Sequence, residues 1–181
     1  MEIAIRQISQ HNLPDGEKCD GTFTVDAKLI LAAKNNVIQF TTVNTTPYQK
    51  RYPVETIDHS TYIDSPDRTI FFAYVDGTIG GQIRLRRNWN HYAYVEDIVV
   101  DVEFRRRGVG RALIQQAVQW AQDKQLSGMM LETQNNNVAA CLLYQRCGFE
   151  LGGFDRLLYQ GQAPHTEEIA LYWYLTFKSE K

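Results

Sequence analysis

YVEDIVVDVEFRRRGVGRALIQQAVQWAQDKQLSGMMLETQ, residues 94–134, decides the fold, because it joins two β-rich runs through a turn and a helical pattern. The turn is rich in arginine and glycine, and Gly128 ends the helical pattern before the run MMLETQ. Within the helical pattern, apolar residues recur at the spacing of one helix face. These residues are Val109, Leu113, Ala117, Trp120 and Ala121. The stretch therefore predicts a strand, a helix and a second strand, with the glycine-rich turn at the helix start.

The segments on either side of this unit predict further strands and one more helix. Residues 2–8 alternate as a first strand, and residues 69–87 form two β-rich runs joined by Asp76-Gly77, a strong hairpin signal. Residues 135–149 predict a second helix with an asparagine cap and Gly148 at its end. The remaining predicted strands are residues 151–160 and 167–177. This order predicts a mixed α/β protein with a central, twisted, largely antiparallel sheet flanked by helices.

Residues 10–68 are harder to assign from their pattern. TFTVDAKLILAAKN, residues 22–35, fits a strand or a helix, and the segment that follows is polar, aromatic and broken by prolines. We expect short helices and an ordered loop here, on the side of the molecule that binds substrate. A length of 181 residues fits one domain, so residues 1–181 are predicted to form a single domain.

The composition disfavours several classes of protein. Hydrophobic residues make up 44% and charged residues 22%, which suits a chain with an ordinary buried core. A formal net charge of −2 disfavours a nucleic-acid partner, because nucleic-acid-binding domains usually carry a basic surplus. No apolar run reaches about 18 residues and the N-terminal segment does not resemble a signal peptide, so we expect a cytoplasmic protein that does not bind membranes. The cysteines and histidines lack ligand spacing, so we predict neither a disulfide framework nor a metal site.

The arginine- and glycine-rich turn, residues 103–112, has the chemistry of a phosphate cradle. A helix N-terminus exposes unpaired backbone N–H groups and carries about half a positive charge. Glycines allow an anion to approach the backbone closely, and arginines add charge and bidentate hydrogen bonds. Together these features suit a pyrophosphate. The alternative is a solvated basic turn, and composition alone does not separate the two.

Two motifs favour the anion-binding interpretation. Arg105, Gly108 and Gly110 form R-x-x-G-x-G with Ala112 following, and residues 137–149 read N-x-x-A-x-x-L-Y-x-x-x-G-F. The first motif resembles the acyl-coenzyme A signature of the GNAT acetyltransferase superfamily, and the second resembles a helix that lies downstream in that superfamily. Over residues 40–177 the chain is similar to the streptothricin acetyltransferases. The segments that carry this similarity are NWNHYAYVEDIVVD (88–101), MMLETQNNNVAAC (129–141), CGFELGGFD (147–155), ALYWYLTF (170–177) and TPYQKRY (46–52).

The resemblance implies the GNAT acyl-CoA N-acyltransferase fold, with acetyl-CoA as cosubstrate and no metal. It implies that backbone N–H groups of residues 106–112 bind the pyrophosphate, helped by arginine side chains, while the pantetheine arm lies along the preceding strand. Asn137 would hydrogen-bond the cofactor near that arm, and the alternative for Asn137 is a simple helix cap. The implied cofactor-binding residues are Ile98, Val99, Val100, Arg105, Arg106, Arg107, Gly108, Val109, Gly110, Arg111, Ala112, Asn137 and Tyr144.

The family transfers an acetyl group to an amine of the β-lysine moiety of streptothricin, so an acceptor ammonium must lose a proton. An alkylamine with a pKa near 10.4 is neutral in about one molecule per thousand at pH 7.4, and a carboxylate can accept its proton. Similarity to polyamine acetyltransferases implies Glu96 as this base and Asp97 as an anchor for a substrate amine, with Glu132 in reserve. Adjacent strand residues face opposite sides unless a bulge intervenes, and the resemblance implies a bulge here. The alternative for each carboxylate is an ion pair with a nearby arginine.

Tyr144 matches the superfamily's general acid, which gives a proton to the departing thiolate. Because a thiol pKa near 8.5 lies below that of tyrosine near 10, a hydrogen bond is sufficient for this role. The alternative is a core tyrosine on the inner face of the second helix. Cys141 and Cys147 lie on that helix without a neighbouring histidine, so we interpret them as core residues and expect no covalent acetyl-enzyme.

A polycationic acceptor requires acidic groups and aromatic faces. The candidate substrate-binding residues are Asp97, Trp89, Tyr94, Tyr48 and Asp155, with Asp64 and Tyr52. Other functions stay open at this point: an N-acetyltransferase for polyamines or for peptide and protein amines, or a non-catalytic acetyl-CoA-binding sensor. Dimers are frequent in the superfamily, and the aromatic segment 172–175 is a candidate for a strand that joins two copies.

Overall fold

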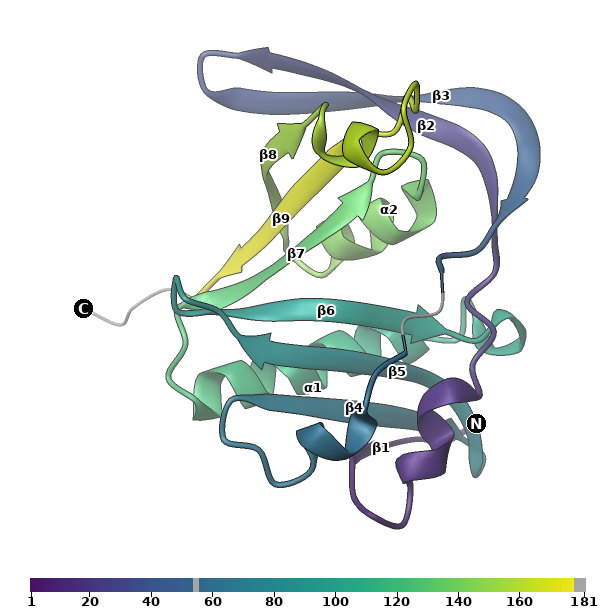
Figure 1. Ribbon diagram of the computed structural model, residues 1–181, viewed down its shortest axis with the longest axis vertical. Helices are drawn as coiled ribbons and strands as arrows, with labels where there is room; N and C mark the ends of the chain where they lie inside the picture. Colours follow the sequence, from purple (N-terminus) through teal and green to yellow (C-terminus); the bar gives the residue numbers. More distant parts are fainter. Residues whose placement is uncertain (54–55, 178–181) are drawn as a thin grey trace. The chain divides into compact units, whose positions relative to one another are not determined.

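The computed structural model describes residues 1–53 and 56–177, which form two compact units (Figure 1). The first unit contains residues 1–23, the described part of 51–129, and residue 177; the second contains residues 24–50 and 130–176. The chain passes between them after Phe23, Lys50 and Met129, and again after Thr176. Each unit is thus assembled from segments far apart in the sequence. The expectation of a single domain stays a prediction.

The first unit contains an antiparallel sheet with the strand order β1-β4-β5-β6. Asp76 and Gly77 have φ angles of 47° and 87°, as a tight hairpin between β4 and β5 requires, so the predicted hairpin is confirmed. The helix predicted from the apolar spacing is also confirmed as α1, Val109–Asp123. The strand bounds are Ile3–Gln7 for β1, Arg68–Val75 for β4, Thr78–Arg87 for β5 and Tyr92–Val100 for β6.

Helix α1 packs closely on this sheet because β5 carries a glycine beneath it. The helix buries its predicted apolar face, and a Cβ atom added to Gly81 would lie 3.0 Å from Val109 Cγ1 and 3.1 Å from Leu113 Cδ1. The same Cβ would lie 2.8 Å from the backbone oxygen of Val99 on β6. A side chain at this position would therefore push apart the helix and the strand that flank the arginine- and glycine-rich turn.

We expect Gly81→Ala to destabilise the protein by about 2 kcal/mol, since overpacking against backbone cannot be relieved by a rotamer change. Thermal unfolding would show this as a fall in Tm of roughly 4–8 °C. Gly161→Ala is the control, because a Cβ at Gly161 would meet nothing within 4 Å. An unchanged Tm for Gly81→Ala would mean that α1 and β6 separate easily.

A second apolar layer in the first unit includes two short 3-10 helices, η1 (Leu13–Glu17) and η2 (His59–Tyr62). Tyr62 joins a buried cluster with Ile8 and with alternate residues of β4, and Leu13 and Ile57 pack against that cluster. Short helices were expected within residues 10–68, so this part of the expectation is confirmed. The cluster residues on β4 are Ile70, Phe72 and Tyr74.

The second unit contains a long β-ribbon that corrects the expectation for residues 22–50. For residues 22–35 the strand alternative is confirmed, and in place of the helices and loop expected in this region β2 (Phe23–Lys34) and β3 (Val37–Lys50) form a two-stranded sheet. Their turn is Asn35-Asn36, with φ angles of 51° and 62°, a left-handed conformation that asparagine tolerates better than most residues. Strand formation prevails because alternate residues of β2 are buried. These residues are Val25, Ala27 and Leu29.

The remaining elements of the second unit confirm the predicted order of strand, helix and two strands. In the sheet order β7-β9-β8, the last strand of the chain lies between the other two. The candidate dimer segment 172–175 lies in β9, which has a neighbour on each side, so it offers no free edge for pairing with a strand of a second copy. A role of this segment in a dimer interface stays a prediction. The element bounds are Gly128–Gln134 for β7, Val138–Arg146 for α2, Glu150–Asp155 for β8, Leu158–Gly161 for η4 and Ala170–Thr176 for β9.

Candidate functional site

In the turn between β6 and α1, a side chain of the turn hydrogen-bonds the backbone of β6. The N–H groups at the start of α1 can donate to an anion. The short helix η3, Val102–Phe104, follows β6, and the Arg105 side chain turns back so that its Nε donates to the Val100 oxygen at 3.0 Å. Gly108 caps α1 with φ of 87°, and the N–H of Ala112 donates to its oxygen at 3.0 Å. The N–H groups before Ala112 therefore lie in the first turn, where a helix leaves its donors unpaired.

The arginines around this turn divide into two groups. Arg105 Nε donates to the backbone of β6, and its role in binding the cofactor stays a prediction. Arg106, Arg107 and Arg111 are exposed, and Arg107 lies 5.7 Å from the centre of the Phe104 ring. No acidic side chain lies in the first turn of α1 to compete for them. The exposed cations and the helix N-terminus together suit a phosphate group.

Strand β6 carries the expected bulge, and Glu96 is its extra residue. Arg84 on β5 pairs with Asp97 and the next residue, Leu85, pairs with Val95, so Glu96 has no partner on β5. The prediction of a bulge beside this pair of carboxylates is confirmed. The bulge changes the strict alternation of side chains at this point of the strand.

Three donors surround the Glu96 carboxylate. The Tyr62 hydroxyl donates to Oε2 at 2.7 Å, Arg84 Nε lies 3.6 Å from Oε2, and Arg86 Nε lies 3.2 Å from Oε1. Burial, together with the hydrogen bond to Glu96, raises the pKa of Tyr62 to about 12, so its proton stays in place. This is the arrangement that the ion-pair alternative for Glu96 describes. The assignment of Glu96 as the base stays a prediction.

Asp97 lies in a different environment, among other acidic groups. Its Oδ2 accepts from Gln82 Nε2 on β5 at 3.2 Å. Burial raises the pKa of the nearby Cys19 thiol to about 12, and the negative charges of Asp101, Asp97 and Asp15 act in the same direction. The surroundings of Cys19 are therefore electronegative, which disfavours a reactive thiolate and favours a cation.

Glu132 is a half-buried carboxylate of the second unit. It lies on β7, and the Tyr159 hydroxyl of η4 donates a hydrogen bond to its Oε1. Burial raises the pKa of Glu132, while the hydrogen bond from Tyr159 and the charge of Lys50 partly offset that effect. Burial therefore makes the Glu132 carboxylate a better proton acceptor than a solvated one.

The three asparagines that follow β7 each bond a different part of the second unit. Asn135 Nδ2 donates to the Leu29 oxygen at 3.2 Å and its Oδ1 accepts from the Ile169 N–H at 3.0 Å. Asn136 Nδ2 donates to Tyr48 and to Glu168. Sequence reasoning missed both roles, although the run of three asparagines was a signal.

Asn137 Oδ1 caps α2 by accepting from the Ala140 N–H at 3.3 Å. This matches the helix-cap alternative for Asn137. Its contact with the cofactor stays a prediction.

Tyr144 is buried within the second unit. Its ring centre lies 5.9 Å from that of Phe149 and 6.3 Å from that of Trp173. This packing matches the alternative of a core tyrosine, and it also fixes the ring that would present the hydroxyl. The role of Tyr144 as an acid stays a prediction.

The candidate substrate-binding residues of the first unit differ in exposure. Trp89 is 88% exposed in the connection between β5 and β6. The Arg86 guanidinium already lies over the Tyr94 ring, at 4.7 Å from its centre. Tyr94 and Glu96 therefore share one arginine, which the sequence did not reveal.

In the second unit, Tyr48 accepts a hydrogen bond from Asn136, and Asp155 Oδ1 accepts from the N–H groups of Leu157 and Leu158. Asp155 also lines a hollow of about 490 Å³ with aromatic, apolar and basic neighbours. These neighbours are Phe154, Arg156, Leu157 and Tyr172. For both Tyr48 and Asp155, binding to substrate stays a prediction.

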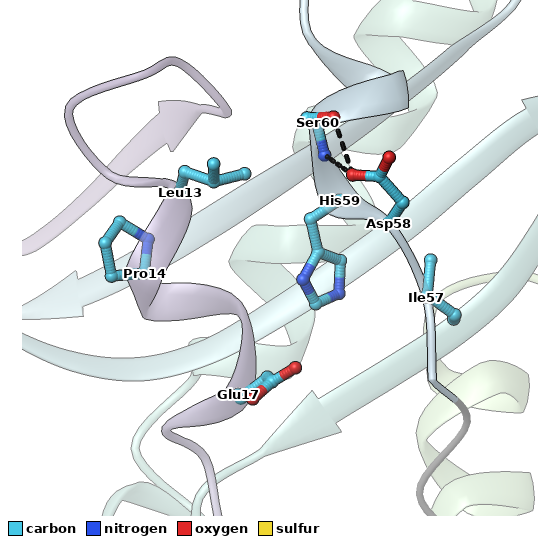
Figure 2. Close-up of a pocket in the computed structure, with 7 residues that line it drawn as sticks. All are labelled: Leu13, Pro14, Glu17, Ile57, Asp58, His59 and Ser60. Carbon is cyan, nitrogen blue, oxygen red and sulfur yellow. Dashed lines mark hydrogen bonds between the residues drawn. The ribbon is translucent and has the colours of Figure 1, made fainter.

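A further pocket of the first unit, of about 380 Å³, was not predicted (Figure 2). Figure 2 shows the His59 ring of η2 between η1 and the segment that leads to η2. A Cβ atom at Gly16 would lie 2.8 Å from this ring, so a side chain at that position would displace the ring. The Asp58 carboxylate caps η2 through Ser60 N and Oγ at 3.0 and 2.6 Å. The remaining lining residues are Leu13, Pro14, Glu17 and Ile57.

Within residues 1–53 and 56–177, no three or more His, Cys, Asp or Glu side chains are grouped as a metal site would require. Among the same residues, no helix has the length and apolar character needed to cross a membrane.

Comparison with known proteins identifies the family. Residues 37–149 match the model of the Acetyltransferase (GNAT) family. The chain is 36% identical to streptothricin acetyltransferase A of Bacillus subtilis (strain 168) over 174 residues, which cover 96% of this chain and 99% of that protein. A solved structure of a Bacillus anthracis protein assigned as a streptothricin acetyltransferase, in complex with acetyl coenzyme A, is 43% identical with a TM-score of 0.92. It covers 97% of this chain and 100% of its own.

A solved nourseothricin acetyltransferase is 33% identical with a TM-score of 0.79, and the match covers 96% of this chain and 98% of that one. The resemblance inferred from the two motifs is therefore confirmed, and so is the mixed α/β fold that it implied. The chain belongs to the Acetyltransferase (GNAT) family and is an acetyl-CoA-dependent N-acetyltransferase.

Proposed function

We propose that the chain acetylates a primary amine of streptothricin, in its β-lysine moiety, and thereby confers resistance to the antibiotic. The observation that supports this proposal most is the similarity to proteins named for streptothricin acetyl transfer along almost the whole chain. That similarity includes β2, which lies outside residues 37–149, the part that matches the family model. Polyamines and peptide amines are the rival acceptors.

The turn before α1 fits the diphosphate of acetyl-CoA. Gly108 and Gly110 let an anion approach the backbone, the first-turn N–H groups donate, and the exposed Arg106, Arg107 and Arg111 add charge. Main-chain groups of Ile98, Val99 and Val100 hold the pantetheine arm, and Asn137 contacts the cofactor. Acetyl-CoA supplies the acetyl group as a thioester. An N–H of the strand near Ile98 polarises the thioester carbonyl, which stabilises negative charge on its oxygen.

We propose Glu132 as the residue that takes the proton from the acceptor ammonium. Its pKa is raised by burial, so its carboxylate binds a proton more readily than an exposed one. Glu96 was the first choice from sequence, but its carboxylate already lies 3.6 Å from Arg84 Nε and 3.2 Å from Arg86 Nε. Glu96 then serves to hold the bulge of β6 in place. Asp97 binds a substrate ammonium.

Tyr144 donates a hydrogen bond to the departing thiolate, and its packing against Phe149 and Trp173 fixes the ring for that purpose. The transfer is direct, from the thioester to the amine. Burial raises the pKa of Cys141 to about 12, so this thiol is a poor nucleophile and a covalent acetyl-enzyme on it is disfavoured.

The experiment that tests the function follows release of free thiol from acetyl-CoA with streptothricin, spermidine or a lysine-bearing peptide. We expect fast release with streptothricin and at least tenfold lower kcat/KM with the other two amines. Release with spermidine or peptide alone would exclude the antibiotic as the preferred acceptor and keep the acetyl-transfer chemistry. Resistance of cells that express the protein, compared with cells that express Glu132→Gln, gives the second measurement.

A further inference from the structure

A buried side-chain oxygen beside Asp97 lacks a hydrogen-bond partner. Gln82 lies on β5 and is 7% exposed. Its Nε2 donates to Asp97 Oδ2 at 3.2 Å, and its Oε1 has no partner among the residues that the structure describes. A buried acceptor without a donor costs about 1–3 kcal/mol, so such a group usually has a further partner.

The orientation of the Gln82 amide follows from the chemistry of its neighbour. An ionised carboxylate only accepts hydrogen bonds, so the amide must present its NH2 group to Asp97 and its oxygen to the other side. Turning the amide over would place two acceptors against each other and leave the NH2 group elsewhere. The unpartnered atom is therefore an oxygen that needs a donor.

The surroundings favour a donor that is also a cation. Asp97 carries a negative charge, and the charges of Asp15 and Asp101 act on Cys19 together with that of Asp97. The segment that carries Cys19 lies beside the residue that follows β6, since the Asp20 N–H donates to Asp101 Oδ2 at 2.8 Å. An ammonium group has three donors and a positive charge, so it satisfies both the Gln82 oxygen and the carboxylate.

We propose that Gln82 and Asp97 form a binding site for a primary ammonium group of the acceptor, namely the one that is not acetylated. This proposal rests on the proposed function, since a β-lysine moiety carries two amines. Holding the second ammonium leaves the first free to react and selects diamines over monoamines. Gln82 then determines specificity through its oxygen, and Asp97 provides the charge.

The test compares Gln82→Met with the unsubstituted protein. Methionine keeps the length of the side chain and removes the oxygen, so we expect KM for streptothricin to rise about tenfold, with kcat and KM for acetyl-CoA within twofold. The acetylated product keeps the second ammonium, so its inhibition constant should rise by the same factor. Gln119→Met is the matched control, because Gln119 makes a similar hydrogen bond to Asp123 on the exposed face of α1.

An unchanged KM and an unchanged product inhibition constant would overturn the proposal. An ordered water would then be the hydrogen-bond donor to the Gln82 oxygen. A rise in KM without a rise in the inhibition constant would also overturn it, since the site would then hold the reacting amine.

A measurement on the unsubstituted protein is independent of streptothricin turnover. We expect the side-chain NH2 resonances of Gln82 to shift on addition of 1,4-diaminobutane and not of 1,4-butanediol. Unshifted resonances would contradict the ammonium site, whereas a lack of turnover with streptothricin would count against the proposed function alone.

Discussion

Replacing Glu132 by glutamine lowers kcat/KM for the amine about 10³-fold, because the variant keeps the shape of the side chain and loses its proton acceptor. Binding of acetyl-CoA should change little, since the residues proposed to hold its diphosphate belong to the turn before α1. Steady-state kinetics and calorimetric titration with acetyl-CoA separate the two effects. Tyr172→Phe is a control, because it removes a neighbouring hydroxyl whose pKa is raised by burial and by Glu132.

The dependence on pH has a definite sign for Glu132. Its pKa in the folded protein lies above its ordinary value, so kcat/KM should fall as the pH is lowered through that raised pKa. This fall of kcat/KM at low pH should be absent from the Glu132→Gln variant. For stability, burial favours the protonated form, so the contribution of Glu132 is present below its unfolded pKa and is lost as the pH rises through its folded pKa. Glu132→Gln should therefore raise Tm slightly at pH 8.

Replacing Glu96 by glutamine should cause a large loss of stability and a small loss of activity, the reverse of Glu132→Gln. The Arg84 side chain is 10% exposed, and the change would leave its charge without the nearby carboxylate. Loss of one partner of a buried ion pair costs about 3 kcal/mol, which corresponds to a fall in Tm of roughly 6–12 °C. At 20 °C, kcat/KM should fall far less than it does for Glu132→Gln. Thermal unfolding and kinetics on the same samples test both statements.

Two further variants test whether the stability lost in Glu96→Gln comes from the ion pairs or from packing. The double variant Arg84→Met with Glu96→Leu removes both charges, so it should recover most of the stability that Glu96→Gln loses. Tyr62→Phe removes one donor to Glu96 and should lower Tm by less than Glu96→Gln. A stable Glu96→Gln that has lost its activity would restore Glu96 as the base and exclude the assignment to Glu132.

Local signals account for most of what the sequence predicted. The apolar spacing of α1 and the Asp76-Gly77 turn each lie within a few residues, and the structure has both. The β-ribbon was missed because the apolar residues of β2 also fit a helix, and because Asn35-Asn36 is a weaker turn signal than asparagine followed by glycine. Its strands are settled by contacts with distant residues, such as the hydrogen bond between Leu29 and Asn135.

The sequence predicted which residues belong to the candidate site, but not which side chains contact one another there. The pair Glu96 and Asp97 was found, and the bulge between them was expected. The donor Tyr62 lies 34 residues earlier in the chain, so no motif linked it to Glu96. Gln82 falls in a strand pattern that also contains arginines, and nothing in that pattern shows which side-chain atom lacks a partner.

The position of β9 between β7 and β8 affects how the protein is made. The strand that lies between β7 and β8 is synthesised after both of them. The strands β2 and β3 of the same unit are already complete at Lys50. At a synthesis rate of about 5–20 residues per second, roughly 6–24 s pass between completion of the ribbon and synthesis of β9. During that interval β7 and β8 expose the edges that β9 later covers, and exposed edges pair with other chains. We therefore expect a lower level of expression, which reduces the concentration of incomplete chains, to increase the yield of folded protein, and removal of residues 170–177 to leave it aggregated.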